Sequence, residues 1–78
     1  MDWKVYVEEN PAVLSGKPVF KGTRLSVELI LQRLGDGYSE EELLGSYPTL
    51  KHEHIRAAFA FAASALSASQ TVYADEIG

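Results

Sequence analysis

The stretch GYSEEELLGSYPTLKHEHIR, residues 37–56, decides the fold class of this chain. Ser39 and Glu42 have the spacing of a capping box, in which each side chain accepts a hydrogen bond from the other residue's backbone N–H at the start of a helix. Pro48 ends that helix, because proline disfavours the helical conformation of the residue before it. A second helix is expected to begin after a short turn, at residue 51 or 52. The stretch therefore predicts two helices joined by a tight connection.

The second of these helices is expected to run to about residue 69. Residues three or four apart share one face of a helix, and this spacing predicts an apolar stripe made of Ile55, Phe59, Ala62 and Leu66. Further apolar residues widen the stripe, among them many alanines. A face this wide suits contact on two sides, with the core and with a partner subunit.

The chain upstream of this pair predicts one more helix and two short strands. Ser26 is the expected N-cap of a helix over residues 26–34, which has apolar residues at helical spacing. Residues 3–8 alternate in polarity, with Trp3, Val5 and Val7 on one face, which predicts a strand. Residues 18–21 predict a second strand.

The expected fold class is mainly α, with a short N-terminal β arm followed by a three-helix domain of helix-turn-helix proportions. The β arm covers residues 3–22 and the three helices cover residues 26–69. We expect a single domain over residues 1–69 and a C-terminal tail over residues 70–78.

Length and composition exclude several classes of protein. With 78 residues the chain is long enough for one small domain, whose core is marginal. It contains no cysteine, which excludes a disulfide scaffold, a thiolate zinc site and a cysteine nucleophile. Since no disulfide can support the small core, self-association is the usual alternative, and we expect a homodimer.

The net charge of −4 argues against indiscriminate binding of nucleic acid, so any anion-binding surface must be a local patch. The N-terminus has no basic start followed by an apolar run, and no apolar stretch is long enough to span a bilayer. The sequence therefore predicts a cytoplasmic protein with no membrane partner.

No catalytic or metal-binding pattern stands out. His52 and His54 are two residues apart, and such residues point in nearly opposite directions on a helix, so they cannot share one metal ion. The acidic run at residues 40–42 is explained by the capping box and the helix dipole. We expect no metal, no cofactor and no enzymatic activity.

The start of the second helix of the pair is a candidate DNA contact. In a helix-turn-helix the second helix presents its N-terminal residues to the major groove. The candidate DNA-binding residues are Lys51, His52, His54 and Arg56, with additional phosphate contacts from Lys17, Lys21 and Arg24. The alternative is a plain helical hairpin whose polar residues are solvated, which fits the acidic residues nearby.

Three motifs resemble a known family. They are GKPVFKGTRLSV at residues 16–27, GYSEEELLGSYPTL at residues 37–50 and IRAAFAFA at residues 55–62. They resemble a small prokaryotic family of domains of unknown function that are described as predicted type II antitoxin components. The resemblance implies a homeodomain-like helical domain behind a short β arm, a dimer, and pairing of the VapB kind with a PIN-like ribonuclease toxin.

The chain departs from the family pattern at three positions. Ser26 stands where the family often has proline, Lys51 where a threonine or serine cap is usual, and His54 where an acid is usual. The last two changes make the helix start more basic than the family pattern. In the matching block Gly22-Thr23-Arg24, glycine permits a backbone turn, threonine can hydrogen-bond locally, and arginine can tie strand to helix or contact phosphate.

The resemblance implies an antitoxin-like protein that neutralises a PIN-like ribonuclease, and the basic helix start adds the expectation that it binds its own operator DNA. The candidate toxin-binding residues are Val72, Tyr73, Asp75, Glu76 and Ile77. An acidic, aromatic tail suits a basic RNA-binding surface better than an acidic metal site. The alternative function is a homodimeric adaptor that binds a protein and never DNA.

Overall fold

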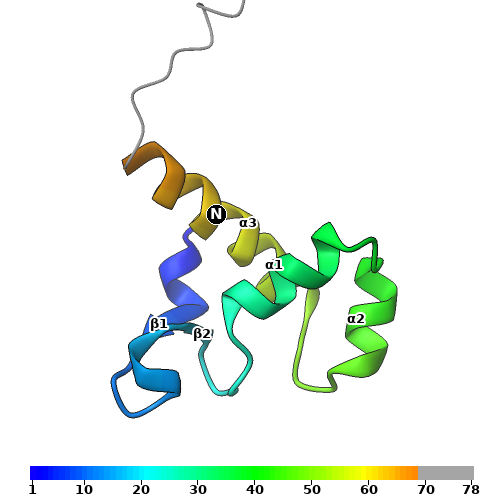
Figure 1. Cartoon of the computed structure of the whole chain (residues 1–78), viewed down its shortest axis with the longest axis horizontal. Coiled ribbons are helices and arrows are strands. Elements are labelled where there is room, and N and C mark those ends of the chain that lie inside the picture. Colours follow the sequence, from blue (N-terminus) through cyan, green and yellow to red (C-terminus); the bar gives the residue numbers. More distant parts are fainter. Residues whose placement is uncertain (69–78) are drawn as a thin grey trace, which may run out of the picture.

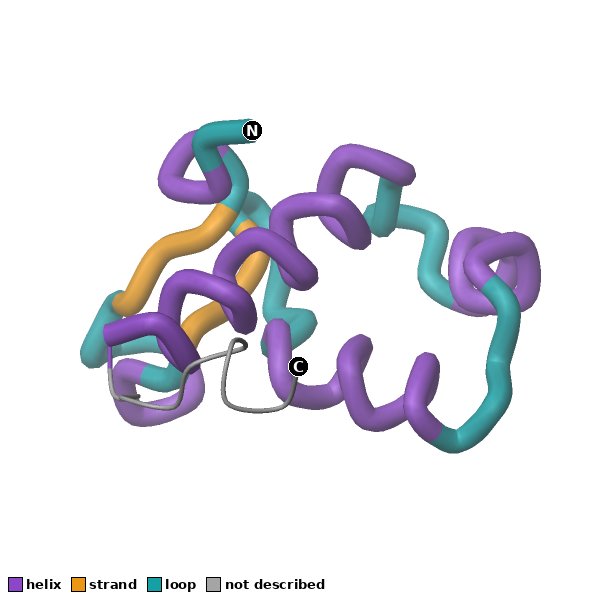
Figure 2. Tube along the Cα trace, turned by 90° about the horizontal axis from the view of Figure 1, so that it is seen from above, coloured by secondary structure: helices purple, strands orange, loops and turns teal. Residues whose placement is uncertain are grey.

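Three helices and one short antiparallel hairpin make up residues 1–68, the part of the chain that the computed structural model describes (Figure 1). In chain order the elements are η1 (Trp3–Val5), β1 (Val7–Glu9), η2 (Leu14–Gly16), β2 (Pro18–Phe20), α1 (Val27–Gly35), α2 (Glu40–Ser46) and α3 (His52–Ala68). The hairpin and α2 lie at opposite ends of the molecule, with α1 and α3 between them (Figures 1 and 2). This part of the chain is a small, mainly helical domain.

The hairpin confirms the second predicted strand and corrects the first. β1 and β2 pair with Val7 opposite Phe20, and Val19 and Phe20 are fully buried. The strand predicted over residues 3–8 is wrong in its first half, because Trp3–Val5 is a short 3₁₀ helix. The Asp2 carboxylate accepts a hydrogen bond from the Lys4 N–H at 3.1 Å, and this local cap competes with an extended backbone.

Two serine caps set the starts of α1 and α2, as predicted. The Ser26 hydroxyl accepts a hydrogen bond from the Leu29 N–H at 3.0 Å. The Ser39 hydroxyl accepts one from the Glu42 N–H at 3.1 Å, and the Glu42 carboxylate accepts one from the Ser39 N–H at 2.8 Å. These bonds satisfy backbone donors that have no partner within their own helices.

The core is built where α1, α2, α3 and the hairpin meet. Its buried apolar members are Val7, Phe20, Val27, Ile30, Leu43, Leu50, Ile55, Ala57 and Ala58. None of these lies beyond residue 58, although α3 continues for ten more residues. The domain therefore uses only the first half of its longest helix to bury apolar surface.

The predicted apolar stripe of α3 is buried only at its first residue. Ile55 is fully buried, but Phe59 is 52% exposed and Leu66 is 60% exposed. The residues that pack inward are instead Ala57, Ala58 and, in part, Phe61. The end of α3 extends beyond α1 and the hairpin, so little of the domain is left for its last turns to contact (Figure 1).

Among the described residues, no helix has the length and apolar character that a membrane crossing requires.

Candidate nucleic-acid interface

The connection between α2 and α3 is a short, anchored turn over residues 47–51. The Leu50 N–H donates a hydrogen bond to the Tyr47 carbonyl at 2.9 Å, and the Leu50 side chain is buried in the core. A hydrogen bond with the Tyr47 side chain raises the pKa of Arg33 in α1 above its ordinary value. The buried Leu50 side chain and the hydrogen bond to the Tyr47 carbonyl anchor the turn and so position the start of α3.

The buried side chain of His54 caps the start of α3. The Lys51 N–H donates a hydrogen bond to the His54 Nδ1 at 2.9 Å. The imidazole packs against Phe20 at 5.1 Å and against the edge of Tyr6 at 6.0 Å between ring centroids. A lysine side chain has no acceptor with which to cap a helix. The His54 ring accepts the backbone N–H of Lys51, as the acidic residue of a capping box does for its N-cap residue.

Burial lowers the pKa of His54 below its ordinary value, and the positive charge of Lys51 lowers it further. The neutral form also keeps the lone pair that accepts the Lys51 N–H. The alternative in which the polar residues of this helix start are solvated does not hold for His54, since only 9% of the residue is exposed. Its ring is therefore not presented to a ligand together with the other candidate DNA-binding residues.

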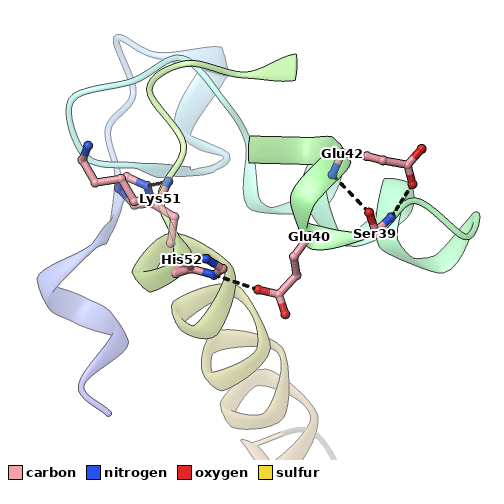
Figure 3. Close-up of polar contacts among 6 residues, drawn as sticks. Ser39, Glu40, Glu42, Lys51 and His52 are labelled. Atoms are coloured by element: carbon pink, nitrogen blue, oxygen red, sulfur yellow. Dashed lines mark hydrogen bonds and ion pairs between the residues drawn. The ribbon is translucent and has the colours of Figure 1, made fainter. Parts of the chain in front are cut away.

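Three of the predicted residues lie exposed at the start of α3: Lys51, His52 and Arg56. The His52 Nδ1 lies 3.2 Å from a carboxylate oxygen of Glu40, which reaches across from α2 (Figure 3). Since His52 and Glu40 are largely exposed, this contact contributes little to stability. His52 and His54 point to different places, one toward α2 and one into the core, as the spacing argument required.

The turn between β2 and α1 carries two more exposed cations, Lys21 and Arg24. Gly22 adopts φ +79°, a left-handed conformation that favours glycine. The Thr23 hydroxyl donates a hydrogen bond to the Phe20 carbonyl at 2.8 Å and accepts one from the Leu25 N–H at 3.0 Å. The expected roles of Gly22 and Thr23 are confirmed, and both are structural.

The two turns are joined through the core. Phe20, which precedes Lys21, packs against His54, and His54 accepts the backbone N–H of Lys51. Both turns lie at the lower edge of the molecule in Figure 1. We call Lys21, Arg24 and Lys51 the basic end. The turns that carry these three cations are 30 residues apart in the sequence and are linked through the contacts of His54.

Lys17 stands apart from the basic end. Its Nζ lies 3.3 Å from a carboxylate oxygen of Glu28 in α1, and both side chains are exposed. Within residues 1–68, no hydrogen bond or ion pair engages the side chains of Lys21, Arg24, Lys51 or Arg56. These four cations are available to an anionic ligand in a way that Lys17 and His52 are not.

Other features of the described part of the chain bear on function. Residues 1–68 contain no group of three or more His, Asp or Glu side chains that could hold a metal ion. An open apolar groove of about 450 Å³ is lined by Pro18, Val27, Glu28, Leu31, Gln32 and Phe61. The sequence analysis missed this groove, because apolar residues from β2, α1 and α3 form it only in the folded chain. The candidate toxin-binding residues, Val72, Tyr73, Asp75, Glu76 and Ile77, lie outside the described residues.

Comparisons with known proteins identify relatives of unassigned function. A family model described as a protein of unknown function, DUF433, matches residues 7–62. The chain is 36% identical over 70 residues to uncharacterized protein y4eO of Sinorhizobium fredii, and the match covers 88% of the chain and 32% of that relative. The chain thus spans about a third of the relative's length. No solved structure matches the chain.

Proposed function

We propose that this chain, which belongs to the DUF433 family of proteins of unknown function, is an antitoxin-like protein without enzymatic activity. In this proposal it binds operator DNA through the start of α3 and neutralises a PIN-like ribonuclease. The observation that supports the DNA contact is the basic end, whose exposed cations lie on two turns that the contacts of His54 link. The toxin partner rests on the family resemblance of the three sequence motifs.

The DNA contact uses α2, its turn and α3 as a helix-turn-helix. The second helix of such a unit enters the major groove with its N-terminal residues, which here include Lys51 and Arg56. Lysine and arginine can both bond guanine edges or phosphate oxygens. Lys21 and Arg24 lie on the other turn of the basic end, where they can contact the phosphate backbone and set the orientation of α3.

The acidic residues of α2 limit where DNA can lie. Glu40, Glu41 and Glu42 are exposed in the first turn of α2, and Glu40 already contacts His52. Phosphates approaching from the α2 side would meet these carboxylates. The duplex is therefore expected on the side of the β2–α1 turn, and His52 contributes less than Lys51 or Arg56.

A binding titration with the chain's own upstream DNA tests this proposal. Lys51→Ala and Arg56→Ala are each expected to weaken binding about 10-fold, the loss of roughly one good contact. Each variant should also reduce the salt slope of log K by about 0.9 if the lost contact is to phosphate. Lys17→Ala is the matched control, because it removes the same charge from a side chain that already pairs with Glu28.

Equal losses of DNA affinity in Lys17→Ala and Lys51→Ala would mean that binding depends only on the net charge of the chain. This would contradict a defined interface. Absence of any binding at low salt, with and without a partner ribonuclease, would leave the homodimeric adaptor as the better function. The toxin half of the proposal is tested separately, by inhibition of a PIN-like ribonuclease encoded beside this chain. Full ribonuclease activity in the presence of excess chain would contradict it.

A further inference from the structure

His54 is the one polar or ionisable residue that is buried within residues 1–68. Burying an imidazole is unfavourable unless its nitrogen atoms are hydrogen-bonded. Its Nδ1 meets this need by accepting the Lys51 N–H at 2.9 Å. An apolar side chain would fill the same space without this requirement. The presence of a ring nitrogen at this position therefore indicates a role beyond packing.

The His54 ring links the start of α3 to the hairpin. It packs against Phe20 of β2 and against the edge of Tyr6, with 5.1 Å and 6.0 Å between the ring centroids. The Tyr6 carbonyl accepts the Lys21 N–H at 2.8 Å. Two routes therefore connect Lys21 to this ring, the peptide bond to Phe20 and the hydrogen bond to Tyr6.

The rest of the turn between β2 and α1 is built on the backbone of Phe20. Its carbonyl accepts the Thr23 N–H at 3.0 Å and the Thr23 hydroxyl at 2.8 Å. Its N–H donates a hydrogen bond to the Leu25 carbonyl at 3.0 Å. Arg24 lies between these two bonded residues, so its backbone follows the position of Phe20. A displacement of the Phe20 ring would therefore shift both Lys21 and Arg24.

The hydrogen bond from Lys51 exists only while the His54 ring is neutral, because a protonated imidazole has no acceptor. The ionisable groups that face the ring are Tyr6 ahead of β1 and, at the start of α3, Lys51 and Glu53. The neighbour on β2, Phe20, carries no charge. Burial and the charge of Lys51 hold the pKa of His54 below its ordinary value, against a smaller opposite effect of Glu53. Acidification therefore converts the ring from an acceptor into a buried cation beside Lys51.

We infer that His54 is a positioning residue of the basic end. Its neutral ring holds the β2–α1 turn and the start of α3 together, and its protonation weakens the binding of DNA by the cations on these two turns. The ring itself touches no ligand in this inference. The inference rests on the proposed function and adds a pH dependence to it.

The expected sign of the effect separates positioning from simple charge. Acidification makes a protein more positive, and charge alone therefore predicts tighter binding to DNA at lower pH. The exposed ring of His52 belongs to this ordinary case, since it gains a charge on the surface. Protonation of His54 instead removes the hydrogen bond at the start of α3, and weaker binding is expected. Two histidines in the same turn of α3 thus have opposite expected effects.

A titration of the full-length chain with its own upstream DNA, at about pH 7 and about pH 5 and at constant ionic strength, measures this sign. His52→Gln removes the ordinary effect, and its affinity should fall about 5-fold on acidification, the weight of one neutral hydrogen bond. His54→Gln is the matched variant, because glutamine keeps an acceptor and does not titrate. Its affinity should not fall on acidification. Circular dichroism of both variants at both pH values verifies that the helices are intact.

Amide hydrogen exchange of the free chain tests the positioning without DNA. The Lys51 N–H is bonded to a group that titrates, whereas the Leu50 N–H is bonded to the Tyr47 carbonyl. Relative to Leu50, we expect the protection of Lys51 to fall at the lower pH in the unsubstituted chain. The ratio of the two should stay constant in His54→Gln.

Two outcomes would overturn the inference. One is an affinity of His52→Gln for DNA that stays constant or rises on acidification. The other is a protection of the Lys51 amide, relative to that of Leu50, that is the same at both pH values. Absence of DNA binding at both pH values, together with a Lys51 amide that responds to pH, would contradict the operator proposal and support the positioning role of His54.

Discussion

The two halves of α3 belong to one continuous helix and have opposite surroundings. The first half, His52–Ala58, contains four ionisable side chains and all four residues of α3 that are buried. The second half, Phe59–Ala68, has no ionisable side chain and no buried residue. Hydrophobicity alone therefore does not identify which part of a helix belongs to the core.

This difference separates the roles of the two halves. The first half is held by a hydrogen bond at its start and by packing against the hairpin and the other helices. The second half contributes one inward side chain, Phe61, which packs against the core and meets the Trp3 ring edge-on at 4.9 Å between centroids, while Phe59 and Leu66 stay largely exposed.

The largest expected effect is on the free energy of unfolding, and it compares a buried and an exposed residue one turn apart on α3. Ile55→Ala removes a fully buried side chain and should lower the free energy of unfolding by about 2–5 kcal/mol. Phe59→Ala removes a larger side chain that is half exposed and should cost less than about 1 kcal/mol. Urea unfolding at low protein concentration measures both, and similar losses would contradict the division of α3 into two halves.

The second expected effect is a pH dependence of stability, which arises only from the first half of α3. Burial holds the pKa of His54 below its ordinary value of 6.5, so the unfolded chain binds this proton at a higher pH than the folded chain does. The stabilisation is therefore complete above pH 6.5 and is lost as the pH falls through the folded pKa. Protonation also removes the acceptor of the Lys51 N–H, so we expect a loss on the order of 1 kcal/mol.

Thermal unfolding between about pH 7 and about pH 5 measures this dependence. His54→Gln should flatten it, because glutamine keeps an acceptor and does not titrate. His52→Gln is the control and should leave the dependence in place, since His52 is exposed. If His52→Gln flattens the profile instead, the buried imidazole is not the group that responds to pH.

The smallest effect tests the contact between α2 and the start of α3. Glu40→Gln weakens the exposed contact with His52 and should change the free energy of unfolding by less than about 0.5 kcal/mol. The same variant removes a negative charge beside the basic end and should raise the affinity for DNA slightly. Glu41→Gln makes the same change of charge without the contact, so a difference between the two variants isolates the role of His52.

Local signals in the sequence were sufficient for much of the fold. Ser26 and Ser39 are caps because a short hydroxyl before a helix can reach a free backbone N–H, and this depends on no distant residue. The turn at Gly22 and Thr23 is equally local. Such features could be predicted because both partners of each bond lie within a few residues of each other.

The features that the sequence did not reveal depend on distant partners or on competing patterns. The buried ring of His54 packs against Phe20 and Tyr6, more than 30 residues away. A signal for it existed, because a helix that begins after a lysine needs an acceptor from its own third residue. At residues 3–5, alternating polarity predicted a strand, but Asp2 offered a local cap that the pattern did not include.

The sequence predicts contact on two sides for the apolar stripe of α3, with the core and with a partner subunit, because an alanine-rich helix is hydrophobic on most of its faces. In such a helix the periodicity does not single out one inward direction, and only the extent of the neighbouring elements decides which turns are covered. The basic end likewise required the fold, because the turns that carry Lys21 and Lys51 are linked only through the contact of Phe20 with His54.

α3 runs without a break from His52 to Ala68, so it fixes both the distance and the rotation between its two ends. From residue 52 to residue 66 it spans about 21 Å at 1.5 Å per residue, and it ties the angular position of one end to that of the other. A single inserted residue near position 58 would lengthen this span by only about 1.5 Å but would swing the far end by about 100°. An insertion of seven residues would instead return the far end to within about 20° of its original heading while lengthening α3 by about 10 Å.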